Sequence, residues 1–250
     1  MTVHFIGAGP GAADLITLRA AALLEASEVC VYAGTYLDAE VLSHCPEGVE
    51  LVDSQHLNLD DLIAVMTRAH GEGKDVARLC SGDPSVYSAI AEQTRRLDAA
   101  GVPWDVCPGV PAYAAAAAII GRELTVPEVV QSVVLTRAQR DSTKMPSTEA
   151  LENFAATRAT LALHLAIRRT RELAERLVPF YGADCPVVVV SRASQPEELV
   201  LRGTLADIGD QVEAQGLTQA AVILVAEALR AEEFVDSHLY SSRVGRPRVE

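Results

Sequence analysis

Three glycine-rich segments contain the residues of this sequence that are best suited to bind a ligand. They read Gly7-Ala8-Gly9-Pro10-Gly11, Ser81-Gly82-Asp83-Pro84-Ser85 and Pro108-Gly109-Val110-Pro111. Because glycine has no side chain, a ligand can approach the main chain closely at such positions. A single loop of this kind commonly does no more than turn the chain. Three of them at one place in a fold would favour a binding site over independent turns.

Each glycine-rich segment directly follows a predicted strand. The strands are Val3–Ile6, Val76–Cys80 and Trp104–Cys107, and helical patterns separate them. Alternating strands and helices with short connections predict a parallel sheet that is covered on both faces. Because open parallel sheets bind ligands at the carboxyl ends of their strands, we expect the three loops to crowd along one edge of that sheet.

The remaining pattern divides the chain into two α/β domains. Residues 1–121 form the first, and Pro127 marks a change of composition before the second, residues 128–230. Residues 231–250 form a polar tail. The first domain also has predicted strands at Val29–Tyr32 and Glu50–Val52. Its predicted helices are Leu18–Ala26, which follows the N-cap candidate Thr17, a helix that follows the N-cap candidate Asn58, and the helices Val86–Ala100 and Pro111–Ile120. The second has predicted strands at Ser132–Thr136, Thr160–Leu165, Val187–Val190 and Ala221–Val225, a strand pair or bulged extension at 198–205, and helices near Glu149–Ala156, Thr170–Pro179 and Ile208–Ala214.

Charge and composition limit the classes of partner. The 250 residues carry a net charge of −13, which opposes nucleic acid or an anionic membrane as a general partner. No apolar run is long enough to span a bilayer, and a strand begins at Val3 with no basic region before it, so we expect a cytoplasmic protein. The five cysteines have no C-x-x-C spacing and no His/Cys/Asp cluster accompanies them, which predicts reduced core cysteines and no metal site.

A nicotinamide dinucleotide is the first alternative for the glycine loop at residues 7–11. Its fingerprint reads G-x-G-x-x-G, but here the third glycine comes one position early and Pro10 separates the last two. The acidic residue expected at the end of the next strand is also missing, because that strand runs into Ala33-Gly34-Thr35. The spacing therefore disfavours an oxidoreductase with this cofactor.

The three loops together carry a family resemblance. Gly7-x-Gly9-Pro10-Gly11 with Asp14-Leu15-x-Thr17-Leu18, Ser81-Gly82-Asp83-Pro84 with Tyr87, and Pro108-Gly109-Val110 resemble the tetrapyrrole methylases, the class III S-adenosylmethionine-dependent methyltransferases of corrin and sirohaem synthesis. Val31-Tyr32-Ala33-Gly34-Thr35, Asp53-Ser54, Glu92-Gln93, Glu123 to Glu128 and Thr136-Arg137 are similar to the branch of that family that methylates precorrin-4 at C-11.

The resemblance implies a fold, a cofactor and partners. It implies two α/β domains, the first with a mostly parallel sheet and the second with a mixed sheet, an active-site cleft between them, and a homodimer. S-adenosylmethionine would be the methyl donor and S-adenosylhomocysteine the product. The substrate would be a small-molecule tetrapyrrole that carries acetate and propionate carboxylates, with no nucleic acid, membrane or metal required.

The resemblance also assigns binding residues. Backbone amides of the glycine loops would bind the cofactor carboxylate, Asp83 would accept from its ammonium or ribose, and small residues would leave a slot for adenine. Pro111 stands where the family often has a small hydroxyl residue. The implied cofactor residues are Pro10, Ser81, Gly82, Asp83, Val86, Pro111, Ala112, Leu163, Ala193, Ala220 and Ala221.

Positioning would dominate the reaction, a direct displacement of the methyl group by an electron-rich ring carbon. A near-attack arrangement can supply about 7–11 kcal/mol. Candidate catalytic side chains are Asp14, Tyr87 and Tyr113, whose alternative roles are a helix cap for the acid and core packing for the tyrosines. Candidate substrate-binding residues are Gly9, Gly11, Arg137, Arg140, Arg168 and Arg192, with Arg169 beside them, because arginine pairs bidentately with carboxylates.

Several interpretations stay open within this resemblance. Relatives methylate other tetrapyrrole positions, including those of precorrin-2, precorrin-3 and uroporphyrinogen III, as well as diphthamide precursors or ribosomal RNA, and the acidic surface disfavours RNA. A non-catalytic ligand-binding module is a further alternative. The sequence leaves open whether the substrate carries cobalt.

Overall fold

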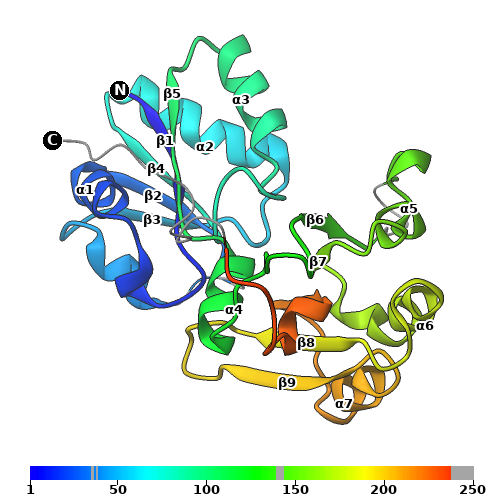
Figure 1. Cartoon of the computed structure of the whole chain (residues 1–250). Coiled ribbons are helices and arrows are strands. Elements are labelled where there is room, and N and C mark those ends of the chain that lie inside the picture. Colours follow the sequence, from blue (N-terminus) through cyan, green and yellow to red (C-terminus); the bar gives the residue numbers. More distant parts are fainter. Residues whose placement is uncertain (35–36, 38, 139–143, 238–250) are drawn as a thin grey trace, which may run out of the picture. The chain divides into compact units, whose positions relative to one another are not determined.

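The computed structural model describes residues 1–34, 37, 39–138 and 144–237, and the chain forms two compact units (Figure 1). The first unit comprises Met1–Ala115 together with Arg192–Glu198, and the second comprises Ala116–Ser191 and the residues from Leu199 onward. The chain therefore divides inside α4 (Ala112–Ile120), whereas the sequence pattern put the boundary after residue 121. The first turn of α4 packs on the second glycine loop: a Cβ at Gly82 would lie 3.6 Å from the Ala112 nitrogen.

The first unit contains a five-stranded parallel sheet in the order β3-β2-β4-β1-β5. Its strands are β1 (Val3–Gly7), β2 (Val29–Tyr32), β3 (Glu50–Asp53), β4 (Val76–Cys80) and β5 (Trp104–Cys107). The predicted parallel sheet is confirmed. Because β1 lies between β4 and β5, the three strands that precede the glycine loops are direct neighbours.

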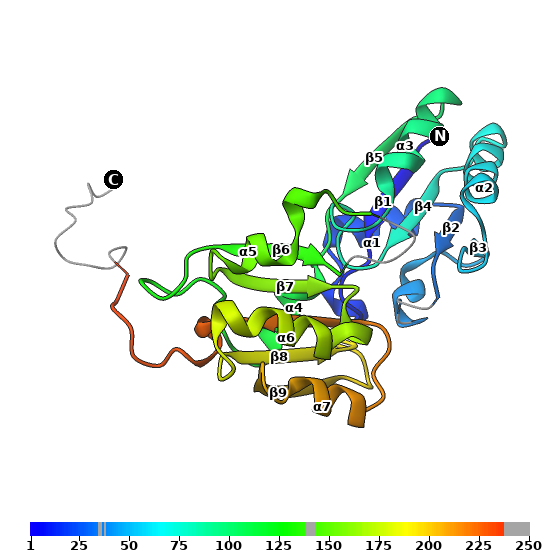
Figure 2. The same cartoon turned by 90° about the vertical axis from the view of Figure 1, so that its right-hand side faces the viewer.

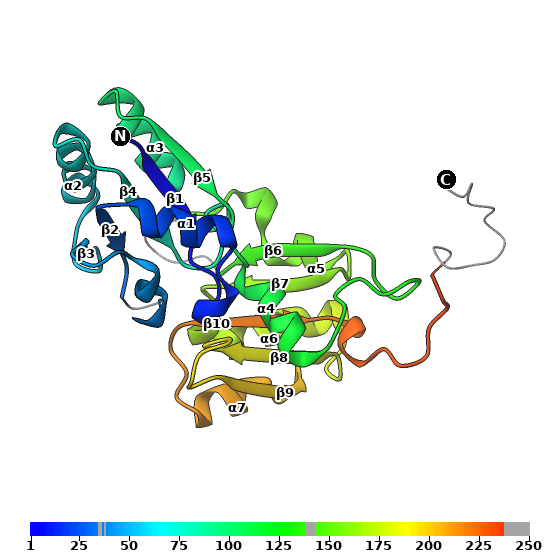
Figure 3. The ribbon, with the colours of Figure 1, turned by 90° about the vertical axis from the view of Figure 1, so that its left-hand side faces the viewer.

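Helices cover both faces of this sheet (Figure 3). They are α1 (Leu18–Ala26), α2 (Leu59–Gly71) and α3 (Ile90–Ala99). Thr17 and Asn58 cap α1 and α2 by accepting from the amides of Ala20 and Asp61, as the sequence predicted. Leu24 packs on one face of the sheet and Met66 on the other, and both are fully buried. Short 3-10 turns at Ala13–Leu15 and Ala39–His44 complete the connections.

The prediction that α3 begins at Val86 is wrong. The helix begins at Ile90, because Tyr87 and Ala89 adopt φ angles of 56° and 54°, which lie in the left-handed region. Residues 81–89 therefore form a loop of their own beside the sheet edge. This loop contains the second glycine-rich segment.

The second unit contains a mixed five-stranded sheet in the order β6-β7-β10-β8-β9. Figure 2 labels β6, β7, β8 and β9 of this sheet, and Figure 3 labels β10. Its strands are β6 (Val133–Arg137), β7 (Thr160–His164), β8 (Pro186–Ser191), β9 (Leu199–Thr204) and β10 (Ala221–Val225). Only β6 and β7 pair in parallel, so the predicted mixed sheet is confirmed. The predicted strand pair or bulge at 198–205 is wrong, since one regular strand, β9, spans that region.

One face of the second sheet carries α5 (Leu151–Ala155), α6 (Thr170–Tyr181) and α7 (Ile208–Ala214). Leu177 of α6 and Ile208 of α7 are buried against Ile223 of β10. Short 3-10 turns lie at Ser147–Glu149, Ile167–Arg169 and Glu227–Arg230, and residues 231–237 belong to no helix or strand. None of the helices in the described part of the chain combines the length and the apolar character needed to cross a bilayer.

Candidate functional site

The three glycine-rich loops meet at the carboxyl edge of the first sheet. Gly9 and Gly82 exchange two backbone hydrogen bonds, Gly82 N to Gly9 O at 2.8 Å and Gly9 N to Gly82 O at 3.2 Å. This pair joins the first loop to the second. The convergence predicted from the sequence is confirmed.

Glycine is required here mainly because the loops pack on one another. A Cβ at Gly109 would lie 2.7 Å from the Gly7 Cα and would collide with the Gly82 carbonyl oxygen. A Cβ at Gly7 would in turn fall on the Gly109 backbone and within 2.9 Å of the same oxygen. Gly82 also has a φ of +69°, a conformation that L side chains rarely adopt. The absence of side chains at Gly7 and Gly109 thus serves contact between loops rather than approach of a ligand.

Asp83 bridges the second and third loops. Its Oδ2 accepts from the Gly109 amide at 2.8 Å, and its Oδ1 accepts from the Ser85 amide at 2.9 Å and from the Ser85 hydroxyl. Burial acts to raise the pKa of the Asp83 carboxyl, but the hydrogen bonds from Ser85 and Gly109 outweigh it and lower the pKa below its ordinary value. Asp83 is therefore an anion whose two oxygens both accept from the protein. Asp83 therefore connects the two loops through contacts within the protein itself.

The first loop is covered by the segment Arg192–Glu198. A Cβ at Gly11 would meet the Gln195 side chain and would lie 2.9 Å from the Ala193 carbonyl oxygen. Ser194 Oγ accepts from the Ala12 amide at 3.0 Å. Ala193, assigned to the cofactor from the resemblance, thus lies beside the first loop, whereas Gly11, assigned to the substrate, is buried under Gln195. Ser194 and Gln195 were missed, because no local pattern connects residue 194 with residue 12.

The other first-unit candidates lie around this edge with different exposures. Ser81 is exposed, whereas Gly9 and Pro10 are buried. Val86, Pro111 and Ala112, together with Tyr113 on α4, are partly buried. Tyr87 is 45% exposed on the second loop. Asp14 is exposed in the turn Ala13–Leu15, and Thr17 rather than Asp14 caps α1.

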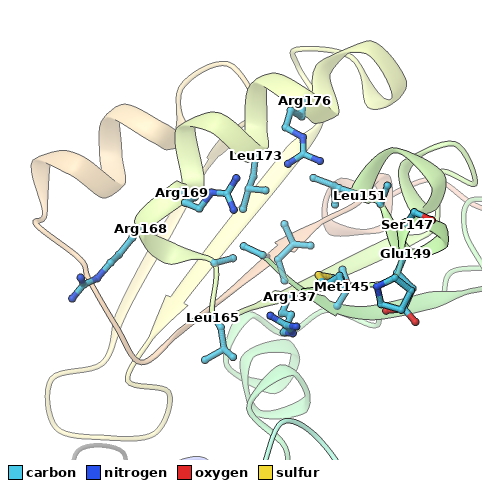
Figure 4. Close-up of a pocket in the computed structure, with 16 residues that line it drawn as sticks. Arg137, Met145, Ser147, Glu149, Leu151, Leu165, Arg168, Arg169, Leu173 and Arg176 are labelled. Carbon is cyan, nitrogen blue, oxygen red and sulfur yellow. The ribbon is translucent and has the colours of Figure 1, made fainter. Parts of the chain in front are cut away.

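The second unit contains a cavity of about 810 Å³ at the ends of β6 and β7 (Figure 4). Arg137, the last residue of β6, pairs in register with His164, the last residue of β7. The lining side chains include four arginines and one glutamate, together with apolar residues such as Leu163 and Leu173. Figure 4 shows Arg169 and Arg176 directed toward the cavity from α6 and the turn before it. The cavity is therefore suited to an anionic ligand with apolar surface.

Acidic neighbours hold these two arginines in place. Arg169 donates to both carboxylate oxygens of Glu172, through Nε at 2.6 Å and through Nη2. Arg176 donates to both oxygens of Glu152 at 2.7 and 3.0 Å, and this pairing raises the pKa of Arg176. Arg176 was missed by the sequence analysis, although its position seven residues after Arg169 puts both on one face of a helix.

The other predicted arginines relate to this cavity in different ways. Arg168 is one of its lining residues, but the head of its side chain points away from the cavity in Figure 4, and its Nε donates to the Thr218 carbonyl at 2.9 Å. Arg192 belongs to the first unit and pairs with Glu197 at 3.6 Å. Arg140 lies outside the described residues.

Two strained backbone positions flank the same edge of the second sheet. Leu165 directly follows β7 and Ala220 directly precedes β10, and each has a φ of 52°. Because β10 runs antiparallel to β7, with Ile223 opposite Leu163, its start lies beside the end of β7. Leu163 and Ala221, assigned to the cofactor together with Ala220, lie on these strands. Strained non-glycine residues gather at functional sites, and the described residues contain no His, Cys, Asp or Glu group arranged for a metal ion.

Comparisons with known proteins agree with this architecture. The sequence model of a family described as tetrapyrrole (corrin/porphyrin) methylases matches residues 2–209. A precorrin-4 C(11)-methyltransferase of Rhodococcus erythropolis is 55% identical over 242 residues, which are 97% of this chain and 97% of that protein. The X-ray structure of CbiF, a cobalt precorrin-4 methyltransferase described as a cobalamin biosynthetic enzyme, matches with a TM-score of 0.88 and 35% identity over 92% of this chain and 96% of that one.

A second similar structure is a complex with S-adenosylhomocysteine. It is the uroporphyrin-III C-methyltransferase of Thermus thermophilus, with a TM-score of 0.78 and 27% identity over 93% of this chain and 96% of that one. The matched residues 2–209 include all three glycine loops and both sheets up to β9. This chain belongs to the tetrapyrrole (corrin/porphyrin) methylases.

Proposed function

We propose that this protein transfers a methyl group from S-adenosylmethionine to C-11 of precorrin-4, as a step of cobalamin biosynthesis. The observation that carries the proposal is the 55% identity, over 97% of both chains, with a precorrin-4 C(11)-methyltransferase. The glycine loops supply a rigid edge of main chain, and the arginine-lined cavity supplies positive charge for a substrate that carries carboxylates.

The first unit is the proposed site of the methyl donor. S-adenosylmethionine supplies an electrophilic methyl group on a sulfonium centre. The residues that fit it are the exposed Ser81 and the buried Gly82 that follows it. The strand-like pair with Gly9, next to Pro10, flanks Gly82 on one side, and the start of α4 lies against it as well. The anionic Asp83 lies beside this backbone and favours a positively charged ligand. Ala193 lies next to the first loop and is the proposed neighbour of the adenine.

The proposed substrate contacts are Arg137, Arg169 and Arg176 in the second unit. A planar guanidinium pairs bidentately with a carboxylate, and the apolar lining of the cavity suits the hydrocarbon part of a macrocycle. Gly9 and Gly11 are less suited to contact substrate, since both are buried beneath protein atoms.

Positioning of the two reactants is the proposed source of most of the rate. An enamine-like ring carbon attacks the methyl carbon as the sulfur leaves with the bonding electrons, and the ring then loses a proton. Tyr87 is the best placed of the three candidate helpers, because it is half-exposed on the loop that carries Asp83. Asp14 and Tyr113 remain proposed helpers at the same sheet edge.

The metal-free substrate is the favoured form. The relative named for precorrin-4 is 55% identical to this chain, whereas the structure named for cobalt precorrin-4 is 35% identical. We also propose that the protein acts in the cytoplasm as a homodimer, which the family resemblance implies. Light scattering of the purified protein would test the second point, since a mass near 27 kDa instead of twice the 26.6 kDa chain would refute it.

One incubation tests the whole assignment. The protein is mixed with enzymatically made precorrin-4, with or without inserted cobalt, and with S-adenosylmethionine that carries a 13C methyl group. We expect one new methyl signal, assigned to C-11 by carbon NMR, and faster turnover of the metal-free substrate. A methyl group at another ring position would reassign the protein within the family, and absence of transfer to any reduced tetrapyrrole would refute the proposal.

A further inference from the structure

The loop between β4 and α3 ends in backbone conformations that its own residues disfavour. Tyr87 and Ala89 have left-handed φ angles of 56° and 54°, which persist in residues other than glycine only when the surroundings hold them. Ala89 also precedes α3 without providing a side-chain cap. Contacts with the rest of the protein are therefore needed to hold this end of the loop.

Gln93, near the start of α3, makes contacts of this kind with Ser88 and Ala89. Its side chain is 2% exposed, and its Nε2 donates to the Ala89 carbonyl at 3.0 Å and to the Ser88 carbonyl at 3.4 Å. Its Oε1 accepts from Arg78 Nε at 3.3 Å. Arginine only donates and carbonyls only accept, so both contacts select the same orientation of the amide.

Arg78 is itself held rigidly in β4. Its Nη1 donates to the Leu79 carbonyl at 2.9 Å and to the Val31 carbonyl at 3.5 Å. All its hydrogen-bond acceptors among the described residues are neutral, and the Gln93 oxygen is the only side-chain acceptor among them. The sheet therefore orients the Gln93 amide, and the amide in turn orients the loop.

Two further hydrogen bonds connect this loop with itself and with the third glycine loop. The Ser88 hydroxyl donates to the Asp83 carbonyl at 3.2 Å, and the Asp83 carboxylate accepts from the Gly109 amide at 2.8 Å. We propose that Gln93 is a positioning residue, which holds residues 81–89 in their ligand-binding conformation through the carbonyls of Ser88 and Ala89. The identity of the ligand rests on the proposed function, whereas the control of the loop does not.

The variant Gln93→Glu separates the accepting function of the Gln93 side chain from its donating function. An ionised glutamate has nearly the same shape and accepts from Arg78 more strongly, but it has no hydrogen to donate to the Ser88 and Ala89 carbonyls. In the free protein we expect amide hydrogen exchange of residues 83–89 to become about tenfold faster, because local opening becomes easier. Titration calorimetry should give about tenfold weaker binding of S-adenosylhomocysteine. The KM for S-adenosylmethionine should rise while kcat at saturation stays within about twofold, which general destabilisation would not produce.

Gln215→Glu is the matched control, since it adds the same charge at an exposed position in the second unit and should match the wild type.

A folded Gln93→Glu variant with unchanged exchange and unchanged affinity would overturn the proposal. If the wild type itself fails to bind S-adenosylhomocysteine, the proposed function fails, and the exchange rates still decide the role of Gln93. If Gln93→Glu does not fold, Gln93→Met decides: it is neutral and removes the donor to the Ser88 and Ala89 carbonyls, and amide exchange of residues 83–89 that stays within about twofold of the wild type would refute the proposal.

Discussion

The two units build their candidate sites in opposite ways. In the first unit, glycines of three loops touch through their backbones, and the Asp83 carboxylate joins two of these loops. In the second unit, long arginine side chains reach a cavity and are held by glutamates such as Glu152 and Glu172. The first arrangement tolerates almost no added atom, whereas the second can adjust by rotation of side chains.

This difference assigns different tasks to the two units. A backbone site has fixed geometry, which suits a small donor whose reactive methyl group must be placed accurately. A side-chain site with several cations suits a larger ligand with several carboxylates at its periphery, because each arginine can pair with one of them. Substitutions in each unit test this division.

Gly109→Ala should be the most damaging single change. The added methyl group collides with the Gly82 carbonyl and with Gly7, so the second and third loops must separate. We expect the free energy of unfolding to fall by about 3 kcal/mol and methyl transfer to fall about 100-fold. Urea unfolding and initial rates at saturating substrate measure the two effects.

Gly71→Ala is the matched control for that experiment. Gly71 ends α2, an added methyl group there would have no atom outside its own stretch of helix backbone within 4 Å, and its φ is not in the left-handed range. The substitution should leave activity unchanged and raise stability by about 0.4–1 kcal/mol. Equal damage from both alanines would mean that the loops are not a rigid backbone site.

Asp83→Asn should have the next largest effect and should depend on pH. Both oxygens of Asp83 accept, so an amide must direct an NH2 group at one of the donors, which costs about 1–2 kcal/mol. The folded pKa of Asp83 lies below its ordinary value of 3.8, so the unfolded chain binds the proton more tightly. The stabilisation is therefore complete above about pH 5 and is lost as the pH falls through the lowered pKa.

Urea unfolding of both proteins between pH 3 and pH 7 measures this difference. The gap between wild type and Asp83→Asn should be constant at neutral pH and should shrink in acid. A gap that stays constant down to the lowest pH would show that the ionised carboxylate does not hold the loops.

The difference between a backbone site and a side-chain site also explains how much of each site could be predicted from the sequence. The glycines and prolines are themselves the first site, so Gly7, Gly82 and Gly109 could be recognised from type and spacing, and the alternation of elements placed them on one edge. Contacts between distant residues were not accessible: Ser194 reaches Ala12 from far along the chain, and Gln93 orders a loop that the helical pattern of residues 86–100 concealed.

The second site could be predicted only as a charge requirement. Adjacent arginines in the sequence point in different directions, because the backbone turns at Ile167–Arg169 before α6 begins. Arg169 therefore faces the cavity while Arg168 bonds the Thr218 carbonyl. No rule of spacing distinguishes two such neighbours before the turn is known.

Arg169→Gln and Arg168→Gln form a pair that tests the second site. Loss of a charged contact with a substrate carboxylate should raise the KM for the tetrapyrrole about tenfold for Arg169→Gln. Arg168→Gln should remain within about twofold of the wild type, since its head points elsewhere. Steady-state kinetics measure both, and calorimetry should give unchanged binding of S-adenosylhomocysteine. A larger rise in KM from Arg168→Gln than from Arg169→Gln would show that the substrate binds on the other side of α6.

Ionic strength should produce the smallest effect and still separate the two sites. The arginines of the cavity are partly exposed, so salt screens their attraction for carboxylates over a Debye length of about 10 Å at 0.1 M. Between about 50 and about 300 mM NaCl we expect the KM for the tetrapyrrole to rise about threefold. The affinity for S-adenosylhomocysteine should change by less than about 1.5-fold, because short backbone contacts at a partly buried edge are screened little. If both affinities fell together with added salt, the donor would be held by exposed charges as well, and the division between a backbone site and a side-chain site would be wrong.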